Sequence, residues 1–193
     1  MATIKHKNQR VAVFIDTQNL YHSAKNLWHG AKVNFKNILD KVVANRELVR
    51  ALAYVITTPD ATENNFFEAL TKMGVETKTK DLQIFFGGNK KADWDVGLAV
   101  DAIKMANKVD VIILATGDGD FVPLVEYLKT FVQVEVISFG KSTATSLREA
   151  ADDFVDMSED PERYLINFSN DPNQKRIRSR AKGVFQRKKI LGE

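Results

Sequence analysis

The chain has 193 residues, of which 44% are hydrophobic and 27% are charged, and it contains no cysteine. These totals are typical of one globular domain of ordinary size. The lack of cysteine excludes disulfides, thiolate zinc sites and a cysteine nucleophile. No apolar run is long enough for a signal sequence or a membrane span, so we expect a cytoplasmic protein with no membrane partner.

The formal net charge of +3 is distributed unevenly. Residues 171–193 hold eight Lys and Arg against two Asp and Glu, so this tail carries +6 and the remainder of the chain −3. An acidic body with a basic tail favours nucleic acid as partner, and a solubilising extension is the alternative. The candidate nucleic-acid contacts in the tail are Lys175, Arg176, Arg178, Arg180, Lys182, Arg187, Lys188 and Lys189.

Apolar, β-branched runs alternate with amphipathic stretches along the chain. Strands are predicted over 11–16, 50–57, 109–116 and 132–139, and the more charged run 75–86 predicts an edge strand or a hairpin. Helices are predicted over 19–27, 35–45, 60–73, 93–107, 120–130 and 142–152, with Asp60 and Ser142 as caps and Pro123 in a first turn.

This alternation predicts an α/β fold, in which a mainly parallel sheet is covered by helices on both faces. Residues 1–160 are predicted to form this domain. Residues 161–193 are predicted to follow it as a short helix, over 161–168, and the basic tail.

Acidic residues follow two of the predicted strands. Asp16 ends the first strand, and Asp118 and Asp120 lie in the GDGDF segment after the strand 109–116. Asp95 lies near the start of the helix 93–107. In open α/β sheets ligands bind beyond the carboxyl ends of the strands, and clustered carboxylates persist when a hard cation such as Mg²⁺ or Mn²⁺ neutralises them. We therefore predict a divalent metal site there.

Helix capping is the alternative for each acid taken alone. Asp16 and Asp120 are both well placed for it, whereas two acids two residues apart after an apolar strand are harder to explain in this way. Asp93 and Asp95 are also two apart, so at most one of them faces the cluster, and Asp93 is predicted to be the helix cap.

Four segments in series carry a resemblance: FIDTQNL, KADWDVGLAVDA, ATGDGDF and SFGKSTATSLREAADDFVD. Together they resemble the NYN domain, in the LabA-like branch of the PIN-like nucleases, over about residues 10 to 157. The resemblance implies a PIN-like, Rossmann-like fold and hydrolysis of RNA by water that carboxylate-held Mg²⁺ or Mn²⁺ activates. Thr116 and Gly119 are mild departures from the family's S-G-D-S-D-F signature.

The resemblance also implies roles for single residues. Asp16, Asp95, Asp118 and Asp120 would be the catalytic and metal-binding acids, and Asn19, Asp101 and Thr116 would support them. Three further candidates come from position and chemistry and not from the resemblance: Lys91 as a phosphate contact, Trp94 as a stacking partner for a base, and Ser142 as a phosphate contact at a helix start. The alternatives are a solvated lysine, a packing tryptophan and a helix cap. Single-stranded RNA is the expected partner, and a homodimer is allowed.

Two other functions share parts of this pattern. A phosphatase of the haloacid-dehalogenase type needs a second Asp two residues after the first, and Gln18 stands at that position. The stronger alternative is a catalytically weak or inactive module that binds nucleic acid and regulates. All of the matched acids are retained, which favours catalysis, because a cluster of negative charge adds little affinity to a surface that only binds phosphate.

Overall fold

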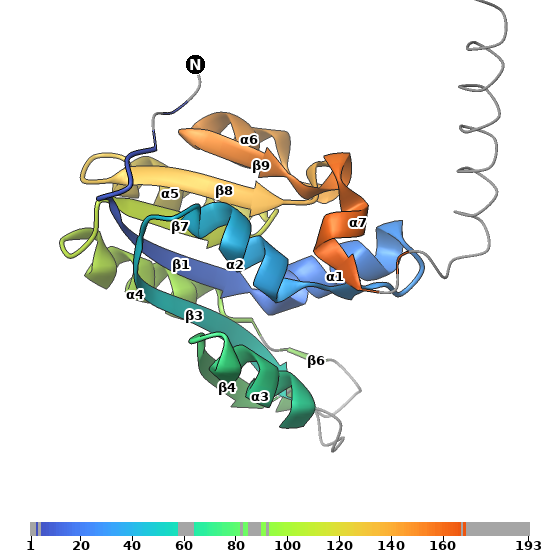
Figure 1. Cartoon of the computed structure of the whole chain (residues 1–193). Coiled ribbons are helices and arrows are strands. Elements are labelled where there is room, and N and C mark those ends of the chain that lie inside the picture. Colours follow the sequence, from blue (N-terminus) through green and yellow to red (C-terminus); the bar gives the residue numbers. More distant parts are fainter. Residues whose placement is uncertain are drawn as a thin grey trace, which may run out of the picture.

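A computed structural model describes residues 3, 5–57, 64–81, 83–84, 90–91, 93–166 and 168. Its centre is a six-stranded sheet in the order β4-β3-β1-β7-β8-β9, and every neighbouring pair in this sheet is parallel (Figure 1). The predicted α/β fold class is therefore confirmed. The strands are β1 (Arg10–Asp16), β3 (Glu47–Thr57), β4 (Glu76–Asp81), β7 (Val111–Ala115), β8 (Gln133–Ser138) and β9 (Asp153–Asp156).

Helices cover both faces of the sheet (Figure 1). The first face packs against α1 (Thr17–Leu27), α2 (Phe35–Val43), α3 (Asn64–Lys72) and α7 (Pro161–Tyr164). The second face packs against α4 (Asp95–Ala106), α5 (Val122–Leu128) and α6 (Thr145–Ala150). None of the described helices is long and apolar enough to cross a membrane.

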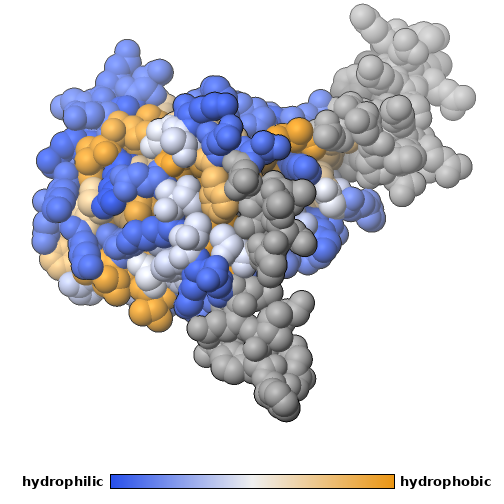
Figure 2. All heavy atoms as spheres, turned by 90° about the horizontal axis from the view of Figure 1, so that it is seen from below, coloured by the Kyte–Doolittle hydropathy of each residue, from blue (hydrophilic) through white to orange (hydrophobic). Residues whose placement is uncertain are grey.

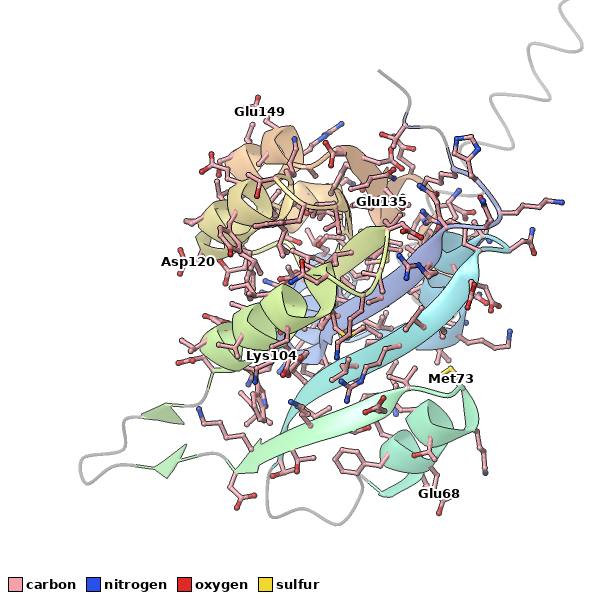
Figure 3. All side chains as sticks on the ribbon, turned by 90° about the vertical axis from the view of Figure 1, so that its left-hand side faces the viewer. Glu68, Met73, Lys104, Asp120, Glu135 and Glu149 are labelled. Carbon is pink, nitrogen blue, oxygen red and sulfur yellow. The ribbon has the colours of Figure 1, made fainter. Side chains whose placement is uncertain are left out.

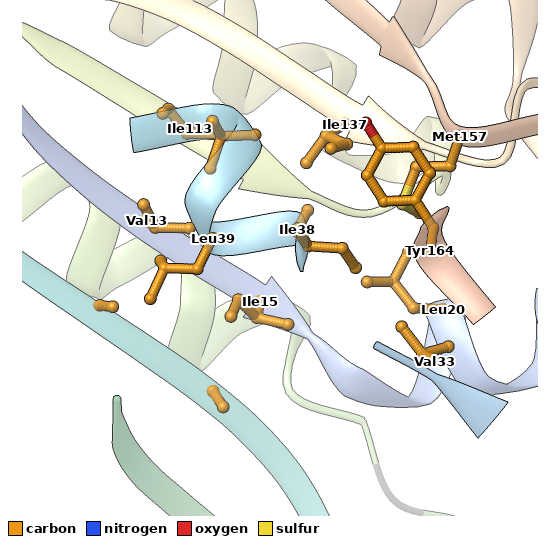
Figure 4. Close-up of a cluster of buried hydrophobic side chains, with 14 of the residues drawn as sticks. Val13, Ile15, Leu20, Val33, Ile38, Leu39, Ile113, Ile137, Met157 and Tyr164 are labelled. Atoms are coloured by element: carbon orange, nitrogen blue, oxygen red, sulfur yellow. The ribbon is translucent and has the colours of Figure 1, made fainter. Parts of the chain in front are cut away.

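The strand β1 contributes to both halves of the core. Successive side chains of a strand point to opposite faces, so Val13 and Ile15 pack under α1 and α2, while Ala12 and Phe14 pack under α4. Figure 4 shows the first of these clusters, in which Val13 and Ile15 lie near Ile38 of α2. Because both of its faces are buried, β1 is an uninterrupted apolar run that ends on Asp16.

The helix predicted over 142–152 is present but shorter, its predicted cap was wrong, and an unpredicted strand follows it. A helix was expected over 142–152 with Ser142 as its cap, but Ser142 ends a 3-10 turn, η3 (Gly140–Ser142), and α6 begins at Thr145 after an N-cap residue, Ala144, that makes no side-chain cap hydrogen bond. The segment ends early because the Asp152 carboxylate accepts from Val134 N at 2.8 Å. The following residues then form β9, whose flanking acids hid its strand pattern.

Other differences are smaller. The run 75–86 contains the expected edge strand, β4, followed by β5 (Gln83–Ile84), which pairs with β6 (Lys90–Lys91). The helix predicted over 60–73 is described from Asn64, and Asp60 lies outside the described residues. The helix predicted over 120–130 is shorter, since a 3-10 turn, η2 (Gly119–Phe121), precedes α5, and Pro123 lies in the first turn as expected.

The described residues beyond 160 pack onto the sheet domain. Helix α7 ends at Tyr164, four residues before the predicted end, and β10 (Leu165–Ile166) then pairs with β2 (Lys32–Val33) in antiparallel fashion. Tyr164, Leu165 and Phe168 are buried in the first core cluster. Residues 169–193, which include the basic tail, lie outside the described residues. The division of the chain at residue 160 stays a prediction.

Candidate metal centre

The sheet order brings the first two predicted acids to one edge. β1 and β7 are neighbours, with Ile15 paired to Ala115, so the residues that follow each strand meet at the carboxyl edge. There the Thr116 hydroxyl donates to Asp16 Oδ2 at 3.2 Å. Asp16 is also the N-cap of α1, where its Oδ1 accepts from Asn19 N at 3.0 Å. Asp16 therefore caps α1 and at the same time lies at the edge where the acids gather.

The turn after β7 is fixed by side-chain hydrogen bonds. Asp118 N donates to Thr116 Oγ1 at 3.3 Å, and Asp118 Oδ1 accepts from Asp120 N at 3.0 Å. The Asn19 side chain accepts from Gly117 N at 2.8 Å, which ties α1 to this turn. A Cβ at Gly117 would lie 2.8 Å from Ser138 Oγ, so only glycine lets this backbone pass so close to β8.

Asp95 completes the cluster from the second face of the sheet. It is the first residue of α4, and its carboxylate, with those of Asp118 and Asp120, offers three oxygens that all lie within 4.8 Å of one another. Asp16 is not in this trio, but with Asp95 and Asp118 it lines one pocket of about 350 Å³. The structure thus brings together the acids that the sequence had placed on three separate segments.

The electrostatics of the pocket favour a cation. Burial, and then the charges of Asp16, Asp93, Asp118 and Asp120, raise the pKa of Asp95 to about 6. Burial likewise raises the pKa of Asp16. Among the described lining residues none is Lys or Arg, and the nearby Lys80 ammonium donates to Asp93 O at 3.0 Å and not to a carboxylate. Oxygen-only donors in this number suit a hard divalent ion such as Mg²⁺ or Mn²⁺.

Asp93 and Trp94 directly precede α4. Asp93 is not the helix cap, because α4 begins at Asp95 and its N-cap residue is Trp94, which makes no side-chain cap hydrogen bond. Trp94 Nε1 donates to Val55 O at 3.1 Å, and its ring packs edge-on against Tyr54. This is the packing alternative, although Trp94 also lines the pocket.

Asp101 points to a different set of partners from the other acids. It accepts from Tyr54 Oη at 2.7 Å and pairs with Lys78 Nζ at 2.6 Å. Burial acts to raise its pKa, but the hydrogen bonds from Lys78 and Tyr54 outweigh burial and lower it. Asp101 is therefore connected to the pocket through its hydrogen bond with Tyr54, which lines it. Its predicted supporting role stays a prediction.

The predicted phosphate contacts are placed as follows. Ser142 lines the pocket, and its hydroxyl donates to Phe139 O at 3.1 Å. Lys91 belongs to β6. The basic residues of the tail lie outside the described residues. For all of these the contact with nucleic acid stays a prediction.

One wall of the pocket was missed by the sequence analysis. Gln18, His22, Ser23 and Asn26 line it from α1. Three of these polar residues are spaced four apart directly after Asp16, and this spacing was the available signal. Helical spacing alone, however, does not tell which side of a helix faces a site.

A parallel α/β sheet with carboxylates gathered at its carboxyl edge is the arrangement of a PIN-like nuclease fold. In agreement, the family model of the NYN domain matches residues 10–159. The chain belongs to the NYN domain family, as the resemblance had implied.

Two known proteins are similar over most of the chain. "Low amplitude and bright protein LabA" from Synechococcus elongatus is 30% identical over 161 residues, which cover 78% of this chain and 84% of that protein. The crystal structure of a protein of unknown function, VPA0982, from Vibrio parahaemolyticus has a TM-score of 0.75 and 30% identity, and the match covers 85% of this chain and 100% of that one.

Proposed function

We propose that the protein is a metal-dependent ribonuclease that hydrolyses phosphodiester bonds of single-stranded RNA. The observation that supports this most directly is the trio of carboxylates from Asp95, Asp118 and Asp120, whose oxygens lie within 4.8 Å of one another at the edge of a PIN-like sheet. A cytoplasmic location, where RNA is abundant, is part of this proposal.

The acid trio would hold one or more Mg²⁺ or Mn²⁺ ions, with Asp16 beside it in the same pocket. A bound divalent ion supplies activation of a water molecule and neutralises charge on the phosphodiester. The protein supplies the positions of the acids. The Thr116 hydroxyl and Asn19 N hold the Asp16 carboxylate, and Asp120 N holds that of Asp118.

The alternative, a binding module without catalysis, is less consistent with the site. The acids of the site repel one another and would also repel the phosphates of a nucleic acid. Unless a cation is held there, the cluster therefore lowers the affinity of the surface for nucleic acid. The pocket of about 350 Å³ is also of the size that takes a small ligand or a single extruded nucleotide, which favours single-stranded over duplex substrate.

The test is incubation of the purified protein with end-labelled single-stranded RNA and Mn²⁺. We expect cleavage that EDTA abolishes and that Asp118→Asn lowers by about 100-fold or more, since even the partners of metal ligands contribute 10- to 100-fold. Asp40→Asn is the matched control, because Asp40 is an exposed acid on α2 far along the chain from the site. Equal cleavage by the wild type and Asp118→Asn would show contamination and remove the proposal's support.

We propose in addition that residues 175–189 give the protein sequence-independent affinity for RNA phosphates. Deletion of these residues should weaken RNA binding and reduce the slope of log affinity against log salt, because fewer counterions are released. An unchanged slope in the shortened protein would exclude the tail from binding.

A further inference from the structure

Helix α1 presents an uncharged polar wall to the pocket that contains the acids. Gln18, His22 and Asn26 are spaced four residues apart and so share one helix face, with Ser23 beside them, and all four line the pocket. We call these four residues the α1 wall. From Gln18 to Asn26 the wall runs about 12 Å along the helix, at a rise of 1.5 Å per residue, starting next to Asp16.

Three of the four side chains of the α1 wall make no hydrogen bond to the described residues. Within the described part of the chain, no side chain or backbone group hydrogen-bonds to the side chains of Gln18, Ser23 or Asn26, whereas Asn19 nearby is engaged with Gly117. Ser23 is only 7% exposed, and its hydroxyl lies at the pocket. The side-chain oxygens and nitrogens of these three residues are therefore available to a ligand or to water at the pocket.

The wall is suited to the uncharged part of a nucleotide. No Lys or Arg is among the described lining residues, so the wall offers phosphate no opposite charge. Amide side chains carry both donors and acceptors, as the edges of nucleobases do. Across the strand ends, Tyr54 and Trp94 add aromatic surface to the same pocket.

We propose that the α1 wall recognises the base of a nucleotide next to the cleaved bond, and thereby sets a base preference. This inference rests on the proposed function for its choice of ligand. The α1 wall adds to the proposed function a determinant of base specificity that is separate from the acids.

The experiment measures binding without cleavage. In an Asp118→Asn background with Mg²⁺, the affinities for labelled pentanucleotides of A, C, G or U are compared by fluorescence anisotropy. We expect a preference of about tenfold or more for one base, which corresponds to roughly 1.4 kcal/mol. The change Gln18→Ala with Asn26→Ala should bring the four affinities to within about twofold of one another. Asn107→Ala, at an exposed asparagine that ends α4, is the matched control and should keep the preference.

The outcomes separate the two proposals. If the four pentanucleotides bind equally, or the double change on α1 keeps the preference, the α1 wall does not read bases, whatever the cleavage assay shows. If the preference exists and is lost with the double change while the wild type cleaves no RNA, the wall is confirmed and the nuclease proposal fails. Absence of any RNA binding overturns the inference. Thermal melts of each variant establish that it is folded.

A second inference rests on α4, which is apolar on the side away from the sheet as well. Leu98, Ala102 and Met105 are buried, while Val96, Val100 and Ile103 form a stripe with exposed fractions of 75%, 41% and 41%. Figure 2 shows hydrophobic atoms interrupting the hydrophilic surface on the face seen from below. An exposed apolar stripe beside the buried face of a helix is a candidate contact surface for a partner.

We infer that the partner is a second copy of the chain, paired antiparallel along α4. The exposed ends of this segment have opposite charges, with Asp93 before the helix and Lys104 in its last turn. A two-fold axis across the stripe therefore sets each acidic end against the basic end of the other copy.

The oligomeric state tests this inference. Light scattering after gel filtration should give twice 21.7 kDa for the wild type and 21.7 kDa for Val100→Lys combined with Ile103→Lys. Phe131→Lys, at a residue 55% exposed outside the stripe, is the matched control and should leave the dimer intact. A monomeric wild type, or a dimer that survives the double change, would overturn the inference.

Discussion

Two regions of the same sheet treat acidic side chains in opposite ways. At the carboxyl edge, Asp95 and its neighbours share a pocket whose described lining holds no Lys or Arg. Toward the amino ends of the strands, the Glu135 side chain of β8 is more deeply buried, but Arg46 pairs with it at 2.7 Å and Lys5 at 3.0 Å. In Figure 3 Asp120 and Glu135 lie at opposite ends of the sheet.

The donors around each carboxylate distinguish a structural acid from a functional one. Glu135 sits in a complete set of donors, since Arg46 binds both of its carboxylate oxygens and Gln133 donates as well. Within the described residues, the donors to the Asp16 and Asp118 carboxylates are backbone N–H groups and the Thr116 hydroxyl. An acid whose charge the fold leaves unopposed indicates that a ligand is expected to oppose it.

The largest effect is expected from breaking the structural pair. Arg46→Met leaves the Glu135 charge buried, so the free energy of unfolding should fall by about 3–5 kcal/mol in urea titrations. Lys36→Met, which breaks the exposed pair between Lys36 and Asp40, is the control and should cost less than about 1 kcal/mol. Similar losses for the two changes would contradict the contrast.

The next effect is the pH dependence of metal binding. The pKa of Asp95 is raised from 3.8 to about 6, so the carboxylate that binds a cation is present above pH 6 and is lost as the pH falls through this value. Calorimetric titration with Mn²⁺ should therefore give an affinity about tenfold weaker at pH 5 than at pH 7, because a proton competes for the ligand. Equal affinities would show that Asp95 is not a ligand.

A smaller effect with the opposite sign to Arg46→Met is expected for Asp95→Asn without metal. The raised pKa means that the charged form of Asp95 destabilises the fold above pH 6 and that protonation relieves this as the pH falls. The uncharged amide should raise the unfolding free energy at pH 7.5 by up to about 1 kcal/mol, since water screens this partly exposed group. The gain should shrink as the pH falls from about 6 to 3.8 and should vanish below pH 3.8, where Asp95 is protonated in the folded and the unfolded protein alike. A loss of stability at pH 7.5 would contradict it.

The smallest effect concerns the hydroxyl that holds Asp16. Thr116→Val removes one hydrogen bond to Asp16 and one from Asp118 N, which should lower the unfolding free energy by about 1 kcal/mol. Its Mn²⁺ affinity should fall by about tenfold, whereas Thr116→Ser should restore both. A valine variant with unchanged affinity would show that the acids are positioned without this hydroxyl.

The sequence was sufficient to predict how Asp16 and Asp118 meet. Each follows an uninterrupted apolar run, and parallel strands of an α/β sheet end at a common edge, so no side-chain detail was needed. Asp95 was harder, because it lies at the start of a helix and not at the end of a strand, and the family resemblance supported its place beside the other acids. Its neighbour Asp93 was wrongly predicted to be the cap, since Trp94 anchors this helix start by packing.

Two other features needed the three-dimensional structure. The α1 wall faces the pocket because Asn19 binds the turn at Gly117, a contact between residues 98 positions apart in the chain. β9 was hidden because its four residues begin and end with Asp, and it is a strand only through its pairing with β8. In both cases contacts distant in sequence outweigh the local pattern.

The short pairing of β10 with β2 bears on where this folding unit can be cut. The family match ends at residue 159, yet Tyr164, Leu165 and Phe168 fill the core beneath β2. A protein truncated at residue 160 would open a cavity where three large side chains had packed, and cavities of that kind cost several kcal/mol. Variants shortened to probe the basic tail should therefore keep every residue through 168, or loss of folding will be mistaken for loss of binding.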